Sequence, residues 1–150
     1  GTIRSESYPL EIMKLFPDIS VSGQACPMWV PLVENNEYNS SGADYFVRKY
    51  INELLEKDNK IDTIVLGCTH YPLLYNKIRE FTPENISIIT QGEYVAQSLK
   101  DYLRRHKEIE QRCTKKGKCD FLTTESVEKF KESASIFLHE EVDVKSITLE

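Results

Sequence analysis

The chain has 150 residues, of which 40% are hydrophobic and 29% charged, a composition typical of one globular domain of ordinary size. Its net charge of -5 gives no support to a nucleic-acid partner, and no apolar run approaches the roughly 20 residues that span a bilayer. The start shows no signal-peptide pattern, and a secreted disulfide scaffold is usually shorter and richer in loops than this chain with its four cysteines. We therefore expect a cytoplasmic protein with reduced thiols that binds neither nucleic acid nor a membrane.

Helical and extended patterns alternate along the chain. Ser5 can cap a first helix, whose apolar positions Tyr8, Ile12 and Leu15 follow helical spacing until Pro17 stops it. The further expected helices cover residues 43–57, 72–81, 93–106 and 125–138, and the expected strands cover residues 18–26, 62–67, 86–90 and 142–149. Residues 27–34 contain two prolines and indicate a loop or a short helix, and residues 111–124 indicate a hairpin that turns near Gly117. This order favours an α/β fold, with a parallel sheet and helices on both of its faces.

The most apolar strand, at residues 62–67, leads into a group of reactive side chains. A continuous apolar run is typical of a strand that is covered on both faces. Ligands of an open α/β sheet bind beyond the carboxyl ends of its strands, where the following helix also directs its first N–H groups. Cys68, Thr69 and His70 lie at that point. The sequence therefore predicts a site for a carboxylate or another small anion, with a thiol for proton transfer or nucleophilic attack. A small buried hydrophobe is the alternative for Cys68.

Four segments of the chain resemble the glutamate racemases, which belong to the aspartate/glutamate racemase family. The stretch GCTHYPLL, from residue 67, resembles their second cysteine motif, and ACPMWVPLVE, from residue 25, resembles an upstream segment. The stretch GTIRSESY, at the start, and TTESVEKF, from residue 123, resemble two further segments, although the latter lacks the Ser-Gly-Asp-Pro core of the family. The order and the separations of the segments agree over the whole chain.

This resemblance implies an enzyme that interconverts L- and D-glutamate for peptidoglycan synthesis, without a cofactor or a metal. Two cysteines of such an enzyme face each other across the substrate Cα, one removing a proton and the other delivering one. Cys68 would be the cysteine on the L-glutamate side, His70 would assist it, and Glu34 would be an acidic helper near the pocket. Thr69 and Thr2 would hold polar groups of the substrate. Aspartate racemases tend to carry Glu at the position of His70, so the histidine favours glutamate.

The first half of the family pattern is absent from this sequence. The Asp-Ser-Gly and Pro-Tyr-Gly segments and the first catalytic cysteine, in Cys-Asn-Thr, have no counterpart here. We therefore expect the C-terminal half of a racemase, inactive alone. By resemblance, residues 1–91 would form the second three-layer α/β domain, which carries Cys68, and residues 92–150 would complete the first domain. The expected partners are glutamate and the missing N-terminal half, with a homodimer as a further possibility.

Two other classes of function stay open from the sequence. A cysteine and a histidine also permit a cysteine-dependent hydrolase or isomerase on the same fold. The missing first half also permits a non-catalytic fragment or binding module. Among the other thiols, we expect Cys26 to be a buried packing residue. Cys113 and Cys119 are expected to be packing thiols as well, because a zinc site needs more ligands at tighter spacing.

Overall fold

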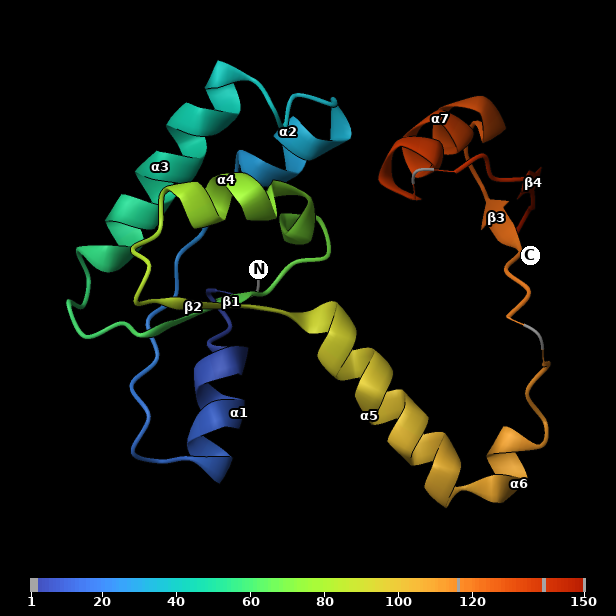
Figure 1. Ribbon diagram of the computed structural model, residues 1–150, viewed down its shortest axis with the longest axis horizontal. Helices are drawn as coiled ribbons and strands as arrows, with labels where there is room; N and C mark the ends of the chain where they lie inside the picture. The colour runs from blue at the N-terminus through green and yellow to red at the C-terminus, as the bar shows by residue number, and fades with distance from the viewer. Residues whose placement is uncertain (1–2, 116, 139, 150) are drawn as a thin grey trace. The chain divides into compact units, whose positions relative to one another are not determined.

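The computed structural model describes residues 3–115, 117–138 and 140–149 (Figure 1). Contacts divide the chain into two compact units, Gly1–Gln91 and Gly92–Glu150. The assignment of these units to two racemase-type domains stays a prediction. Within the described residues, no helix is both long and apolar enough to cross a membrane.

The first unit is a two-stranded parallel sheet with helices on both sides. Its elements are α1 (Ser7–Leu15), α2 (Trp29–Glu34), α3 (Ser41–Leu55), β1 (Thr63–Leu66), the 3-10 helix η1 (Tyr71–Leu74), α4 (Tyr75–Glu80) and β2 (Ser87–Thr90). Strands β1 and β2 pair in parallel, from Thr63 opposite Ser87 to Leu66 opposite Thr90. Helices α2, α3 and α4 lie on one side of the strands and α1 lies on the other (Figure 1). The predicted α/β fold is confirmed.

The second unit is smaller and also contains a parallel pair of strands. Its elements are α5 (Gln91–Arg105, whose first residue belongs to the first unit), α6 (Lys107–Glu110), β3 (Phe121–Thr123), α7 (Val127–Leu138) and β4 (Val144–Ser146). Strands β3 and β4 pair from Phe121 opposite Val144 to Thr123 opposite Ser146. The predicted hairpin over residues 111–124 is therefore wrong: among the described residues of that segment, the strand that forms is β3, and it pairs with β4, beyond helix α7, and not with a preceding strand.

Helix α3 supplies much of the core of the first unit. Its residues Ala43, Val47, Tyr50 and Ile51 are buried and recur at helical spacing along one face. The largest fully buried side chains of the unit come from five elements and are Val33, Val47, Ile51, Leu66, Leu74 and Ile78. The core therefore lies on the side of the sheet that α2, α3 and α4 cover.

Ser40 caps the start of α3, because its hydroxyl accepts a hydrogen bond from the Ala43 N–H at 3.2 Å. We expect Ser40→Ala to lower the free energy of unfolding by about 1 kcal/mol, the usual cost of losing such a cap. Urea denaturation followed by circular dichroism measures the change. Ser40→Asp retains a capping oxygen and should be close to the parent chain; equal losses in both variants would contradict a capping role.

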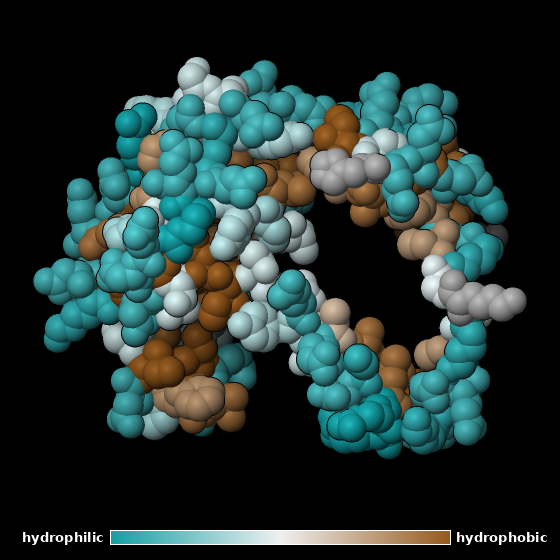
Figure 2. All heavy atoms as spheres, viewed as in Figure 1, coloured by the Kyte–Doolittle hydropathy of each residue, from teal (hydrophilic) through white to brown (hydrophobic). Residues whose placement is uncertain are grey.

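The other face of the sheet is only partly covered, which corrects the prediction that β1 is buried on both faces. Ile64 and Leu66 are buried, but Val65 between them is 46% exposed. Helix α1, on that side, buries none of its residues. Among its apolar side chains, Leu10, Met13 and Leu15 are exposed. The space-filling view shows hydrophobic surface, in brown, in the region of α1 (Figure 2).

Two local predictions near the start of the chain are also wrong. Residues 18–26 form no strand, because their contacts run to α3 and its end: the Lys57 ammonium donates to the Gly23 carbonyl at 2.6 Å, and the Gln24 amide donates to Glu53 at 2.8 Å. Ser5 does not cap α1. The cap residue is Glu6, in a left-handed conformation with φ 52° and without a side-chain capping bond.

Candidate functional site

The expected reactive side chains lie where the chain leaves β1. Gly67 follows the strand, and a Cβ at this position would stand 3.4 Å from the Tyr8 hydroxyl, so α1 approaches the backbone closely here. The chain then turns at once, with the Tyr71 N–H donating to the Cys68 carbonyl at 3.1 Å. The helix after the turn begins as the four-residue 3-10 helix η1, with Pro72 in its first turn. The turn places Cys68 half-buried at the carboxyl end of the sheet.

The structure brings Cys68, His70 and Glu34 together in one chain of contacts. The Cys68 Sγ lies 3.8 Å from His70 Nδ1. The other ring nitrogen, His70 Nε2, lies 3.4 Å from Glu34 Oε1, at the end of α2. The imidazole side chain is 34% exposed and the carboxylate side chain 60% exposed, so solvent reaches both. Thr69 is exposed on the same turn, and Thr2 lies outside the described residues.

This arrangement can move protons. A neutral imidazole has one donor and one acceptor nitrogen, and the contact that each makes selects the tautomer. The tautomer with its proton on Nε2 donates to the Glu34 carboxylate and leaves Nδ1 to accept from the Cys68 thiol. Proton transfer from the thiol would then give a thiolate beside an imidazolium, which the Glu34 carboxylate stabilises.

Behind this chain of contacts lies a buried group that the sequence reasoning missed in part. The rings of Trp29 and Tyr71 meet edge to face, with centroids 4.7 Å apart, and the Tyr71 hydroxyl interacts with the Cys26 thiol. Cys26 is 8% exposed, which confirms its expected burial. The same expectation is wrong for Cys113 and Cys119, which are both exposed. Burial raises the pKa of Cys26 to about 12, although the interaction with Tyr71 opposes this. Burial is also the main cause that raises the pKa of Tyr71.

The raised pKa of Cys26 predicts a loss of stability in alkali. The unfolded thiol titrates near its ordinary value of 9.0 while the folded thiol titrates near about 12, so the fold favours the protonated form. The resulting contribution to the free energy of unfolding is fully present below about pH 9 and is lost as the pH rises towards about 12. Urea denaturation across this range measures the slope. Cys26→Ser does not titrate and should have a shallower slope; an unchanged slope would contradict the assignment.

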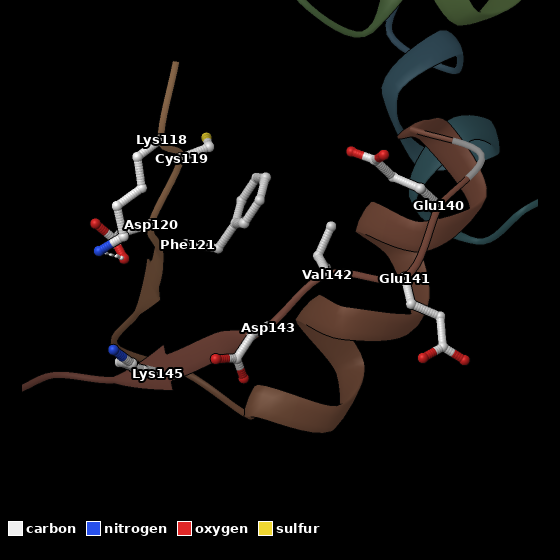
Figure 3. A pocket seen from close by; sticks show the side chains of 9 residues that line it. All are labelled: Lys118, Cys119, Asp120, Phe121, Glu140, Glu141, Val142, Asp143 and Lys145. Atoms are coloured by element: carbon white, nitrogen blue, oxygen red, sulfur yellow. Dashed lines mark ion pairs between the residues drawn. The ribbon is translucent and has the colours of Figure 1, made fainter. Parts of the chain in front are cut away.

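A pocket in the second unit holds none of the expected site residues. It is lined by Lys118, Cys119, Asp120, Phe121, Glu140, Glu141, Val142, Asp143 and Lys145. Its charged side chains do not converge on one point, and Lys118 pairs with Asp120 at 3.0 Å (Figure 3). Across the described parts of the chain, no three His, Cys, Asp or Glu side chains are grouped to hold a metal ion. We assign no chemistry to this pocket.

Comparison with known proteins identifies relatives along nearly the whole chain. No family model matches it. The glutamate racemase of Thermoanaerobacter sp. strain X514 is 37% identical over 142 residues, which are 95% of this chain and 52% of that protein. The glutamate racemase of Streptococcus mutans is 38% identical over 148 residues, 99% of this chain and 55% of that protein. Over nearly its whole length, this chain is similar to about half of a glutamate racemase.

Solved structures agree with this relationship. The crystal structure of glutamate racemase isoform RacE1 from Bacillus anthracis matches with a TM-score of 0.85 and 32% identity, over 99% of this chain and 54% of that one. Glutamate racemase from Francisella tularensis, in complex with D-glutamate, matches with a TM-score of 0.84 and 25% identity, over 99% of this chain and 55% of that one. The chain spans about half the length of the relatives it matches. The predicted resemblance is confirmed, and the roles of the individual residues stay predictions.

Proposed function

We propose that this chain carries one of the two acid–base cysteines of a cofactor-independent glutamate racemase, and that this cysteine is Cys68. The observation that carries the proposal is the contact of both His70 ring nitrogens, one with the Cys68 sulfur and the other with the Glu34 carboxylate. The names of the relatives supply the substrate class, since the similar proteins are glutamate racemases. A neighbour solved with D-glutamate supports a small amino acid as the ligand.

The proposed reaction is a two-base proton transfer at the Cα of glutamate. The Cys68 thiolate removes the α-proton from L-glutamate, and a thiol on the opposite face delivers a proton to give D-glutamate. His70 holds the proton that Cys68 releases, and Glu34 stabilises the imidazolium. Thr69 and Thr2 bind polar groups of the substrate. Cys68 protonates the same carbon in the reverse direction.

The opposite base is proposed to come from outside this chain. Cys26, the other cysteine of the first unit, is buried and has a pKa raised to about 12, so it stays protonated and shielded from substrate. The N-terminal half of a racemase is the proposed source, and two copies of this chain in a homodimer are the alternative. In this proposal residues 1–91 belong to the second racemase domain and residues 92–150 complete the first. The chain alone is then inactive, and the complete enzyme supplies D-glutamate for peptidoglycan in the cytoplasm.

A chimera tests the proposal directly. This chain replaces the matching 148-residue part of the Streptococcus mutans relative, whose remaining half then supplies the opposite face. Formation of D-glutamate from L-glutamate is followed by chiral chromatography, for the chimera and for the isolated chain. We expect turnover by the chimera and none by the isolated chain, because general acid–base catalysis needs both groups in place.

Two results would contradict the proposal. A chimera that folds with the circular dichroism of the parent enzyme but forms no D-glutamate would show that this chain lacks a competent half-site. Covalent trapping of Cys68 as an acyl-enzyme by an ester or amide substrate would favour the cysteine-dependent hydrolase instead.

A further inference from the structure

Two contacts hold the Tyr71 side chain, one with α2 and one with the residues just before α2. Its ring packs edge to face on Trp29, with centroids 4.7 Å apart and planes at 76°. Trp29 is itself fixed, since it is 2% exposed and its Nε1–H donates to the Phe46 carbonyl at 3.4 Å. The second contact is an electrostatic interaction of the Tyr71 hydroxyl with the Cys26 thiol. The Cys26 thiol in turn donates to the Gln24 carbonyl at 3.8 Å. Tyr71 is therefore anchored at both ends of its side chain.

The same residue holds the reactive turn from its other side. The Tyr71 backbone N–H donates to the Cys68 carbonyl at 3.1 Å and so closes the turn that carries His70. Helix α2 begins at Trp29 and ends at Glu34. One end of this short helix thus packs on Tyr71, while its other end places the Glu34 carboxylate 3.4 Å from His70 Nε2. The distance between Glu34 and His70 therefore depends on how Tyr71 packs the turn against α2.

We propose that Tyr71 is a positioning residue, which holds the turn at residues 68–71 against α2 so that His70 bridges Cys68 and Glu34. This inference rests on the proposed role of Cys68 as an acid–base group. Tyr71 acts through His70 and does not itself exchange a proton with the substrate. Its raised pKa, caused first by burial, agrees with a hydroxyl that stays protonated.

The test measures the reactivity of Cys68 in the full chain, without glutamate. Iodoacetamide alkylation is followed peptide by peptide by mass spectrometry, which separates Cys68 from the exposed Cys113 and Cys119. The rate depends on the thiolate fraction, which a neighbouring imidazole increases. We expect Tyr71→Leu to slow alkylation of Cys68 near neutral pH by about three- to tenfold.

A double-mutant cycle separates positioning from general destabilisation. If Tyr71 acts through His70, Tyr71→Leu should change the Cys68 rate less than about twofold once His70→Gln is present. Tyr71→Phe keeps the ring contact with Trp29 and should recover most of the rate. Tyr75→Leu, at the more exposed first residue of α4, is the matched control and should leave the rate unchanged.

Several ionisable groups surround the turn and bear on the reactivity of Cys68. His70 and Tyr71 lie on the turn, and Glu34 faces it from α2. Cys26 lies behind it, and Glu53 and Lys57 act on Cys26 with opposite signs. Glu34→Gln therefore belongs in the series, and it should slow Cys68 alkylation in the parent background but not beside His70→Gln.

The proposal is overturned if Tyr71→Leu has no effect, or if it has the same effect with and without His70. If Tyr71→Leu fails to fold, Tyr71→Met, which keeps more of the buried volume but removes the ring, gives the same cycle. The experiment uses no substrate, so its outcome is separate from that of the chimera. An inactive chimera with a His70-dependent effect of Tyr71 would reject the racemase assignment while keeping the positioning role.

Discussion

Replacing Cys68 by Ala in the chimera is expected to remove racemisation, by about 10³-fold or more. The reason is that alanine has no proton to exchange with Cα, and no other group of the described site replaces the thiol: His70 is held between Cys68 and Glu34, and Cys26 is buried behind Tyr71. His70→Asn should cost less than Cys68→Ala, since it removes a helper and leaves the base.

Deuterium exchange can show which face of the substrate Cys68 serves. In heavy water, proton NMR reports loss of the Cα–H signal separately for L- and D-glutamate. If Cys68 serves the L face, Cys68→Ala should abolish exchange from L-glutamate, while the opposite base can still exchange D-glutamate slowly. Cys68→Ser is the matched control, because it keeps size and a hydroxyl but is a much weaker acid, and it should resemble Cys68→Ala. Loss of exchange from D-glutamate alone would contradict the assignment of Cys68 to the L face.

The helices could be predicted from the sequence where one face carries a periodic apolar stripe. Residues 43–57 show such a pattern, and α3 forms there, over Ser41–Leu55. The strands were harder to predict than the helices. A strand forms only where another strand pairs with it, and the local sequence does not show which segment that is. Residues 18–26 alternate like a strand, but Lys57 and Gln24 tie them to α3 and its end. The choice of β4 as the partner of β3 is likewise a long-range contact.

The candidate site could likewise be predicted only where its contacts are local in the sequence. Cys68 and His70 are neighbours in sequence, so their meeting follows from a turn after a strand. Glu34 entered through the resemblance, and its contact with His70 depends on how α2 packs. The contact between the Tyr71 and Trp29 rings was missed, because nothing in the local sequence of either segment predicts that the two rings meet. The only sequence signal for this contact was that an aromatic residue lies close to each of the two segments that supply site residues.

Trp29→Ala is expected to lower the free energy of unfolding of the first unit by about 3–5 kcal/mol, the usual cost of emptying a buried tryptophan site. Trp29 is 2% exposed and contacts the rings of both Tyr50 and Tyr71, so its loss leaves a cavity between α2, α3 and η1. Because Trp29 is the only tryptophan, urea denaturation must be followed by circular dichroism.

Two further variants decide what the loss means. Trp29→Phe keeps an aromatic ring against Tyr71 and should recover much of the stability, whereas Tyr45→Ala, at a side chain that is 56% exposed on α3, should cost far less than Trp29→Ala. A loss below about 1 kcal/mol for Trp29→Ala would show that α2 is not held through this residue. Since α2 carries Glu34, the same packing that stabilises the unit also sets the carboxylate beside His70. A destabilised Trp29→Ala chain should therefore also show slower alkylation of Cys68, which links the core of this unit to its proposed chemistry.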